Sequence, residues 1–113
     1  MTKPSIGIGN IEVNLGGESL VLRPSLAAAL AISRKDGGIM SMVQACTRFD
    51  LDAIAFVVAQ GLGRPASEVT ELIWNTGIAK VAPAAIQFCT VLSNGGRPLG
   101  ASGGEEKGNP RNG

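Results

Sequence analysis

Residues 5–25 read SIGIGNIEVNLGGESLVLRPS, and this stretch decides the fold. Apolar and polar residues alternate over residues 11–15, and a second strand-like run follows over residues 18–22. Gly16 and Gly17 lie between the two runs. A glycine pair suits the tightest hairpin turn, because both central residues of that turn need positive φ. The pattern therefore predicts an antiparallel β-hairpin within residues 6–23.

The position of the turn also predicts the register of the hairpin. The expected pairs on one face are Ile11 with Leu22, Val13 with Leu20, and Leu15 with Glu18. All but Glu18 are apolar, so this face is expected to pack on a core while the opposite face meets solvent. Ile6 and Ile8 fall on the wrong parity for the apolar face, and a bulge at Gly9-Asn10 would correct this.

The chain after Pro24 carries helix signals. Apolar residues recur at helical spacing in five segments, which are expected at residues 26–35, 39–48, 51–60, 68–76 and 78–93. Ser25, Asp50 and Ser67 are predicted to cap three of these helices at their N-termini. The segment Gly61-Leu62-Gly63 and the residue Gly77 are predicted to end two of them. The expected fold is mainly α: an N-terminal β-hairpin followed by a compact bundle of about five short helices.

The composition changes abruptly after Asn94. Residues 95–113 are rich in glycine and poor in apolar side chains, so they are predicted to form a disordered tail. Such a tail serves as a frayed terminus, a linker or a recruitment arm. We therefore expect one domain at residues 1–94, with the hairpin in 6–23 and the helices in 25–93.

The composition excludes several classes of partner and of catalytic chemistry. The 113 residues carry 10 basic and 9 acidic side chains with no basic stripe, so nucleic acid is not an expected partner. There is no histidine, which removes the commonest general base and metal ligand. Cys46 and Cys89 are expected to be reduced, buried thiols, with a bridging or catalytic pair as the alternative. No apolar run reaches the ~18 residues of a membrane span, so we expect an intracellular protein with no membrane partner.

The glycine and acidic motifs are predicted to be structural. The dinucleotide fingerprint that begins at Gly7 and Gly9 would need a third glycine where Glu12 stands. Asp50 and Asp52 lie in a first helical turn, where carboxylates favour the helix dipole. The sequence thus offers no catalytic, cofactor-binding or metal-binding residues, and no enzyme activity or cofactor is expected.

The remaining indication of function is apolar surface that could contact a partner. The helices carry more hydrophobic residues than a thin five-helix core needs, so some are expected to contact a partner. The candidates fall outside the narrowest apolar stripes: Ile32, Met40, Phe56, Val57, Trp74 and Ile86. The alternative is that these residues are buried in a wider core.

The order of these features resembles that of the tail assembly chaperones of phages and gene transfer agents, a group also labelled gene-transfer-agent tail tube proteins. The resemblance covers about residues 8–97, and its motifs are these: LVLRPS at 20–25, DGG at 36–38, DLDAI at 50–54, VAQGL at 58–62, WNTG at 74–77 and NGG at 94–96. Residues that match the family pattern are expected to be architectural: Leu22, Arg23, Pro24, Gly38, Gly61, Leu62 and Gly77.

The resemblance implies a non-enzymatic protein, mostly helical with a small N-terminal β element. Such proteins bind the tape measure protein in the host cytoplasm, recruit the tail tube protein, and are absent from the mature particle. Self-association of the chain is a further expectation. Two alternatives remain: a structural tail component of the virion, which the low strand content disfavours, and a small DNA-binding regulator, which the missing basic stripe disfavours.

Overall fold

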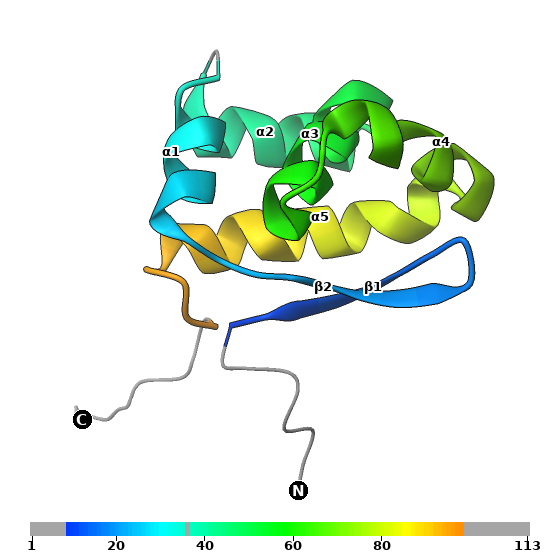
Figure 1. Cartoon of the computed structure of the whole chain (residues 1–113). Helices are drawn as coiled ribbons and strands as arrows, with labels where there is room; N and C mark the ends of the chain where they lie inside the picture. Colours follow the sequence, from blue (N-terminus) through cyan, green and yellow to red (C-terminus); the bar gives the residue numbers. More distant parts are fainter. Residues whose placement is uncertain (1–8, 36, 99–113) are drawn as a thin grey trace, which may run out of the picture.

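The computed structural model describes residues 9–35 and 37–98, and it has the expected mainly α architecture (Figure 1). An N-terminal hairpin precedes five helices. The elements are β1 (Ile11–Leu15), β2 (Glu18–Leu22), α1 (Leu26–Ser33), α2 (Gly38–Thr47), α3 (Leu51–Leu62), α4 (Ala66–Thr76) and α5 (Ile78–Ser93). The hairpin lies along one side of the helical bundle, and α5 runs between the hairpin and α2 (Figure 1).

The hairpin has the predicted register. Its pairs include Ile11 with Leu22, Val13 with Leu20, and Leu15 with Glu18. Gly16 and Gly17 have φ values of 62° and 83°, which are the positive angles that a two-residue turn of this kind requires. The side chains of β1 alternate between buried and exposed, so the apolar face covers the core as expected.

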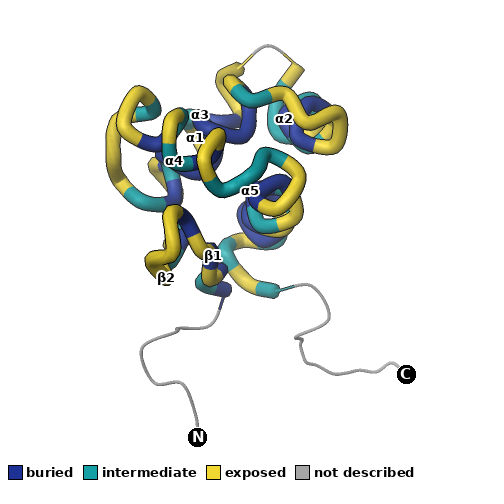
Figure 2. Tube along the Cα trace, turned by 90° about the vertical axis from the view of Figure 1, so that its right-hand side faces the viewer, coloured by how far each residue is buried: buried dark blue, intermediate teal, exposed yellow. Residues whose placement is uncertain are grey.

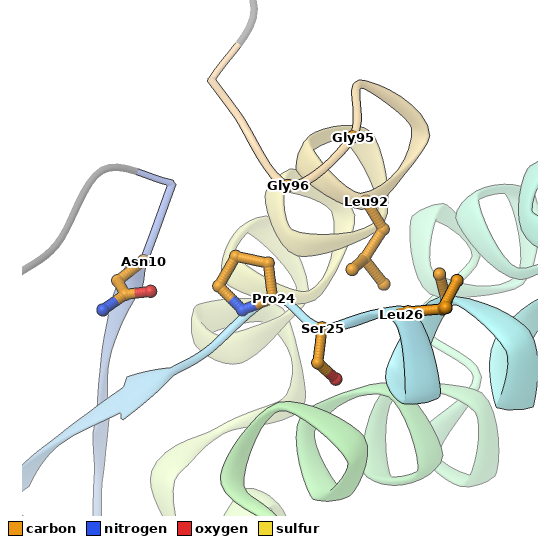
Figure 3. A pocket seen from close by; sticks show the side chains of 8 residues that line it. Asn10, Pro24, Ser25, Leu26, Leu92, Gly95 and Gly96 are labelled. Atoms are coloured by element: carbon orange, nitrogen blue, oxygen red, sulfur yellow. The ribbon is translucent and has the colours of Figure 1, made fainter.

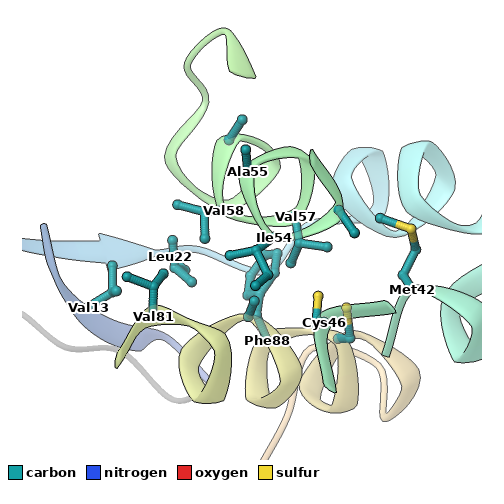
Figure 4. Close-up of a cluster of buried hydrophobic side chains, with 14 of the residues drawn as sticks. Val13, Leu22, Met42, Cys46, Ile54, Ala55, Val57, Val58, Val81 and Phe88 are labelled. Atoms are coloured by element: carbon teal, nitrogen blue, oxygen red, sulfur yellow. The ribbon is translucent and has the colours of Figure 1, made fainter. Parts of the chain in front are cut away.

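A single core joins the hairpin to the helices. Phe88 of α5 has no exposed surface, and side chains of the hairpin, α2 and α3 lie around it (Figure 4). The fully buried side chains come from the hairpin and from all five helices: Leu15, Leu22, Ile32, Cys46, Ile54, Val57, Val58, Val69, Ile73, Val81, Phe88 and Cys89. The buried segments face inward in Figure 2, and the exposed segments form the outside of the bundle. The hairpin is therefore part of the domain rather than an arm.

The predicted helix caps are confirmed except at the start of α4. Ser25 and Asp50 accept hydrogen bonds from the backbone N–H groups of Ala28 and Ala53, and Gly77 ends α4. Ser67 does not cap α4, because Pro65 already occupies the cap position with its fixed φ of −63°. Of the predicted stop at Gly61-Leu62-Gly63, Gly63 caps α3, whereas Gly61 and Leu62 lie inside the helix.

The third helix continues past Gly61, because this glycine lets the helix pack closely against β2. The end of α3 falls at Gly63, where φ is 71° and the backbone N–H bonds to the Ala59 carbonyl. Gly61 is buried against β2, and its carbonyl accepts a hydrogen bond of 2.9 Å from the Arg23 N–H. A close approach of two backbones favours glycine, since any side chain would separate them.

We expect Gly61→Ala to lower the free energy of unfolding by about 1–3 kcal/mol, although alanine normally favours a helix. A Cβ at this position would lie 2.8 Å from the Leu22 Cβ and 3.2 Å from the Leu22 Cα. Urea unfolding measures the change. Gly63→Ala is the control, because its new Cβ meets no atom within 4 Å. Only the positive φ of this position disfavours alanine, so the free energy of unfolding should fall by about 1 kcal/mol. A Gly61→Ala variant more stable than the parent chain would contradict the close approach of α3 to β2.

The ordered chain continues beyond the predicted start of the tail. The Gly96 N–H bonds to the Val91 carbonyl, and the Asn94 side chain donates to the carbonyls of Arg97 and Pro98. The prediction that the tail begins at residue 95 is therefore wrong by four residues, because these bonds fold residues 95–98 back onto the end of α5. The rest of the predicted tail, 99–113, and the first hairpin residues, 6–8, lie outside the described part of the chain.

Candidate functional site: an apolar surface on the first helix

The first helix is apolar on more than one side. Its sequence, LAAALAIS, contains no charged side chain. Ala28 and Ile32 face the core and are buried. Leu26 is 75% exposed and Leu30 is 40% exposed. These two leucines are four residues apart and share the outer face of the helix, which leaves an apolar stripe facing solvent.

A groove lies beside this stripe, between the start of α1 and the end of α5 (Figure 3). Its volume is about 360 Å³, and its lining residues are Asn10, Pro24, Ser25, Leu26, Ala29, Leu92, Gly95 and Gly96. Most of the lining side chains are apolar, and the Ser25 hydroxyl is already engaged as the cap of α1. The groove therefore suits an apolar side chain from a partner better than a charged ligand.

The partner-facing residues proposed from the sequence are spread over the molecule. Ile32 and Val57 have no exposed surface, so their assignment to the partner surface is wrong. The neighbouring helices cover wider arcs of α1 and α3 than the narrow stripes suggest. Met40 on α2 and Trp74 on α4 are exposed, at 66% and 67%, as expected of contact residues.

Phe56 and Ile86 lie between these extremes. Both are half-buried and pack against the edge of the core. The Lys35 Nζ lies 4.4 Å from the centre of the Phe56 ring, so a cation covers the outward part of this side chain. Phe56 therefore belongs more to the α1–α3 packing than to an open surface.

Three exposed apolar residues were missed from the sequence. Leu26 and Leu30 were not among the predicted contact residues, although each pair, Leu26 with Leu30 and Ala28 with Ile32, has i, i+4 spacing and the two pairs are offset by two residues, which places them on different faces of the helix. The third is Phe49, which is 52% exposed and has a φ of 61° in the turn after α2. Glycine or asparagine is usual at such a position, and a bulky residue is strained there.

The two cysteines are buried and unpaired, as the sequence indicated for structural thiols. Burial raises the pKa of the Cys46 thiol from 9.0 to about 11, and the nearby Asp50 carboxylate acts in the same direction. Burial likewise raises the pKa of the Cys89 thiol to about 12, with a further contribution from Cys46. Both thiols are therefore protonated near neutral pH, which is the unreactive form.

Most acidic side chains with a recorded role lie at helix N-termini, and the Glu12 carboxylate instead accepts a hydrogen bond from the Ser19 hydroxyl across the hairpin. The Asp50 carboxylate bonds to the Ala53 N–H at 3.2 Å, and Asp52 and Glu68 lie in first helical turns. Within residues 9–35 and 37–98, no three histidine, cysteine or acidic residues lie together in a way that could hold a metal ion. No helix of the same residues is long and apolar enough to span a bilayer.

Comparison of the chain with known protein families, with curated proteins and with solved structures found no match.

Proposed function

We propose that this protein is a tail assembly chaperone of a phage or gene transfer agent. In this role it binds the tape measure protein, keeps it soluble in the host cytoplasm and aids assembly of the tail tube, and it is absent from the finished particle. The chaperone has no enzymatic activity and acts through protein contacts alone. The fold supports the proposal, because a mainly helical domain with a small N-terminal hairpin is what the resemblance implies.

The observation that carries the proposal is the exposed apolar stripe of Leu26 and Leu30 beside its groove. Full burial of one leucine side chain is worth about 1.5–3 kcal/mol, so a client that covers both gains affinity without any charged contact. A long helical client presents apolar residues at the same i, i+4 spacing, which allows its side chains to enter such a groove.

We expect the double substitution Leu26→Ser and Leu30→Ser to weaken binding of the tape measure protein at least tenfold, since a loss of 1.4 kcal/mol suffices for that factor. The measurement is the amount of soluble tape measure protein on co-expression, together with the affinity of the purified pair. Both leucines are exposed, so the fold is expected to survive, and circular dichroism checks this.

Ala27→Ser is the matched control, because Ala27 is exposed on the same helix. This control should leave binding unchanged. If Trp74→Ser abolishes binding while the leucine pair does not, the client site lies on α4 and the proposed surface is wrong. If the parent chain leaves the solubility of the tape measure protein unchanged, the chaperone function itself fails. Mass spectrometry of purified particles tests the structural alternative, because a virion component would be present in them.

A further inference from the structure

The outer edge of β1 carries backbone groups that the hairpin leaves open. Leu15 and Glu18 flank a two-residue turn and form a hydrogen-bonded pair, and such pairs alternate along an antiparallel ladder. Val13 therefore bonds toward β2, whereas the backbone groups of Glu12 and Asn14 point outward. Within the described part of the chain, no backbone group outside the hairpin bonds to either residue.

Two hydrogen bonds at the ends of the strands support this assignment of the outward groups. Gly16 continues the outward series of β1, and its N–H donates to the Thr76 hydroxyl at 2.8 Å. Arg23 continues the outward series of β2, and its N–H donates to the Gly61 carbonyl at 2.9 Å. The end of the β2 edge is therefore covered by α3, which distinguishes it from the edge of β1.

A groove of about 510 Å³ follows the edge of β1. One wall is β1, and the other is formed mainly by a stripe of α5 with the helical spacing i, i+3, i+4, i+7. The lining residues are Glu12, Val13, Asn14, Thr76, Lys80, Pro83, Ala84 and Gln87. The middle of the stripe, Pro83 and Ala84, has short side chains, so the helix leaves space beside the strand.

This space follows from the packing of the hairpin on the helices. The strand β2 packs on α3, and β1 packs on α5. Packed helices lie about 8–10 Å apart, but paired strands lie only about 4.8 Å apart. Figure 2 accordingly shows α5 extending beyond β1 on the side away from β2. The space below this overhang suits one further strand.

A second copy of the chain does not fit this space. Antiparallel pairing of two β1 edges would place a two-fold axis next to the strand, normal to the sheet. Each α5 overhangs its own β1 edge, so the axis would bring both copies of α5 into the same volume. The occupant must be an extended segment with no helix beside the edge that pairs.

The lining groups define the side chains that such a segment carries. Val13 is buried, so the residue opposite it points under α5, where a small apolar side chain fits. Glu12 and Asn14 are exposed, so the residues opposite them face solvent and are polar. Glu12 and Lys80 are the charged lining residues, and the Glu12 carboxylate already accepts a hydrogen bond from the Ser19 hydroxyl. Lys80 therefore favours an acidic residue in the occupant.

We propose that the open edge of β1 binds an extended segment of a partner protein as a third, antiparallel strand in the groove below α5. The segment reads polar, small apolar, polar opposite Asn14, Val13 and Glu12, and an acidic residue precedes this triplet. The acidic residue then lies at the end of the groove where Thr76 binds the hairpin turn and α5 begins with Lys80 in its first turn. Main-chain hydrogen bonds supply the affinity, and the side chains supply the selectivity.

This site is separate from the apolar stripe on α1. The groove beside Leu26 and the groove below α5 share no lining residue. The strand site therefore stands or falls independently of the proposed chaperone function.

A titration of the isotope-labelled full chain with the blocked peptide acetyl-SETVTS-amide, followed by NMR, tests the proposal. We expect the amide signals of Glu12 and Asn14 to shift, and their hydrogen exchange to slow at least tenfold at saturation. Two control peptides differ only in the position of N-methyl groups. Methylation of both threonines removes the donors that face β1 and should weaken binding at least tenfold. Methylation of the valine, whose N–H faces away from β1, should leave binding nearly unchanged.

Variants of the chain test the same edge. Asn14→Pro removes one outward N–H without breaking a bond to β2, and it should weaken peptide binding at least tenfold. Ser19→Pro is the matched control, because Ser19 pairs with Asn14 but directs its N–H to the opposite edge of the hairpin. Lys80→Glu should weaken binding of this peptide, and a peptide with lysine in place of glutamate should restore it.

Each of the following outcomes would overturn the proposal. The amides of Glu12 and Asn14 do not shift at saturating peptide, or the two N-methylated peptides bind equally well. Both amides are already protected in the chain alone, which would assign the edge to another segment of this chain or, if protection rises with protein concentration, to a second copy. The amides in the centre of α5 report whether each variant is folded, and the N-methylated peptides test the edge on the parent chain if Asn14→Pro unfolds.

Discussion

Phe88→Ala is expected to lower the free energy of unfolding by about 3–5 kcal/mol, because it empties the centre of the core. The Phe88 ring has no exposed surface, and it lies among side chains of α2, α3 and the hairpin (Figure 4). The truncated side chain loses the free energy gained by burying the ring. It also leaves a cavity, because the surrounding elements cannot move together to fill the space. For a domain of this size the loss is a large share of the total stability.

Thermal and urea unfolding measure the effect of Phe88→Ala. Phe88→Leu keeps most of the volume and should cost about 1.5 kcal/mol or less. Gln87→Ala changes the adjacent, exposed position and should cost less than about 0.5 kcal/mol. A Phe88→Ala variant as stable as Gln87→Ala would show that the helices and the hairpin do not share one core.

The protein is expected to lose several kcal/mol of stability as the pH rises from about 9 to 12, because both buried thiols must stay protonated in the fold. The pKa values of Cys46 and Cys89 are about 11 and about 12 in the fold, against an ordinary value of 9.0. Between these values the unfolded chain has released protons that the folded chain still holds, so stability falls with rising pH. Each unit of pKa difference corresponds to about 1.4 kcal/mol.

Urea unfolding at a series of pH values tests this expectation. The stabilisation is fully present below pH 9, and its loss is complete near pH 11 for Cys46 and near pH 12 for Cys89. The double variant Cys46→Ala and Cys89→Ala should be less stable at pH 7 through lost packing, but its stability should fall less steeply above pH 9. Equal slopes for the two proteins would show that the thiols are not buried. A thiol reagent should also react slowly with the folded parent chain and fast in urea.

Local sequence determined much of this fold. The hairpin register follows from one glycine pair and the alternation around it, and the ends of α5 follow from Gly77 and the polar residues after Ser93. These features depend on neighbours in the chain, whose φ preferences and side-chain periods are readable without any tertiary contact. The mainly α fold class follows from the same kind of signal.

Contacts between distant segments decided where α3 ends and which apolar side chains are buried. Gly61 read as a helix stop, but β2 approaches it so closely that it lies inside α3. Ile32 and Val57 read as surplus apolar surface, and neighbouring helices bury them. Leu26 and Leu30 remain exposed on a helix that is apolar on both faces. Periodicity shows which residues share a face, whereas the width of the buried arc depends on the elements that pack against it. The chain by itself thus determined the elements and the hairpin register, and only the tertiary packing decided which apolar surfaces remain open to a partner.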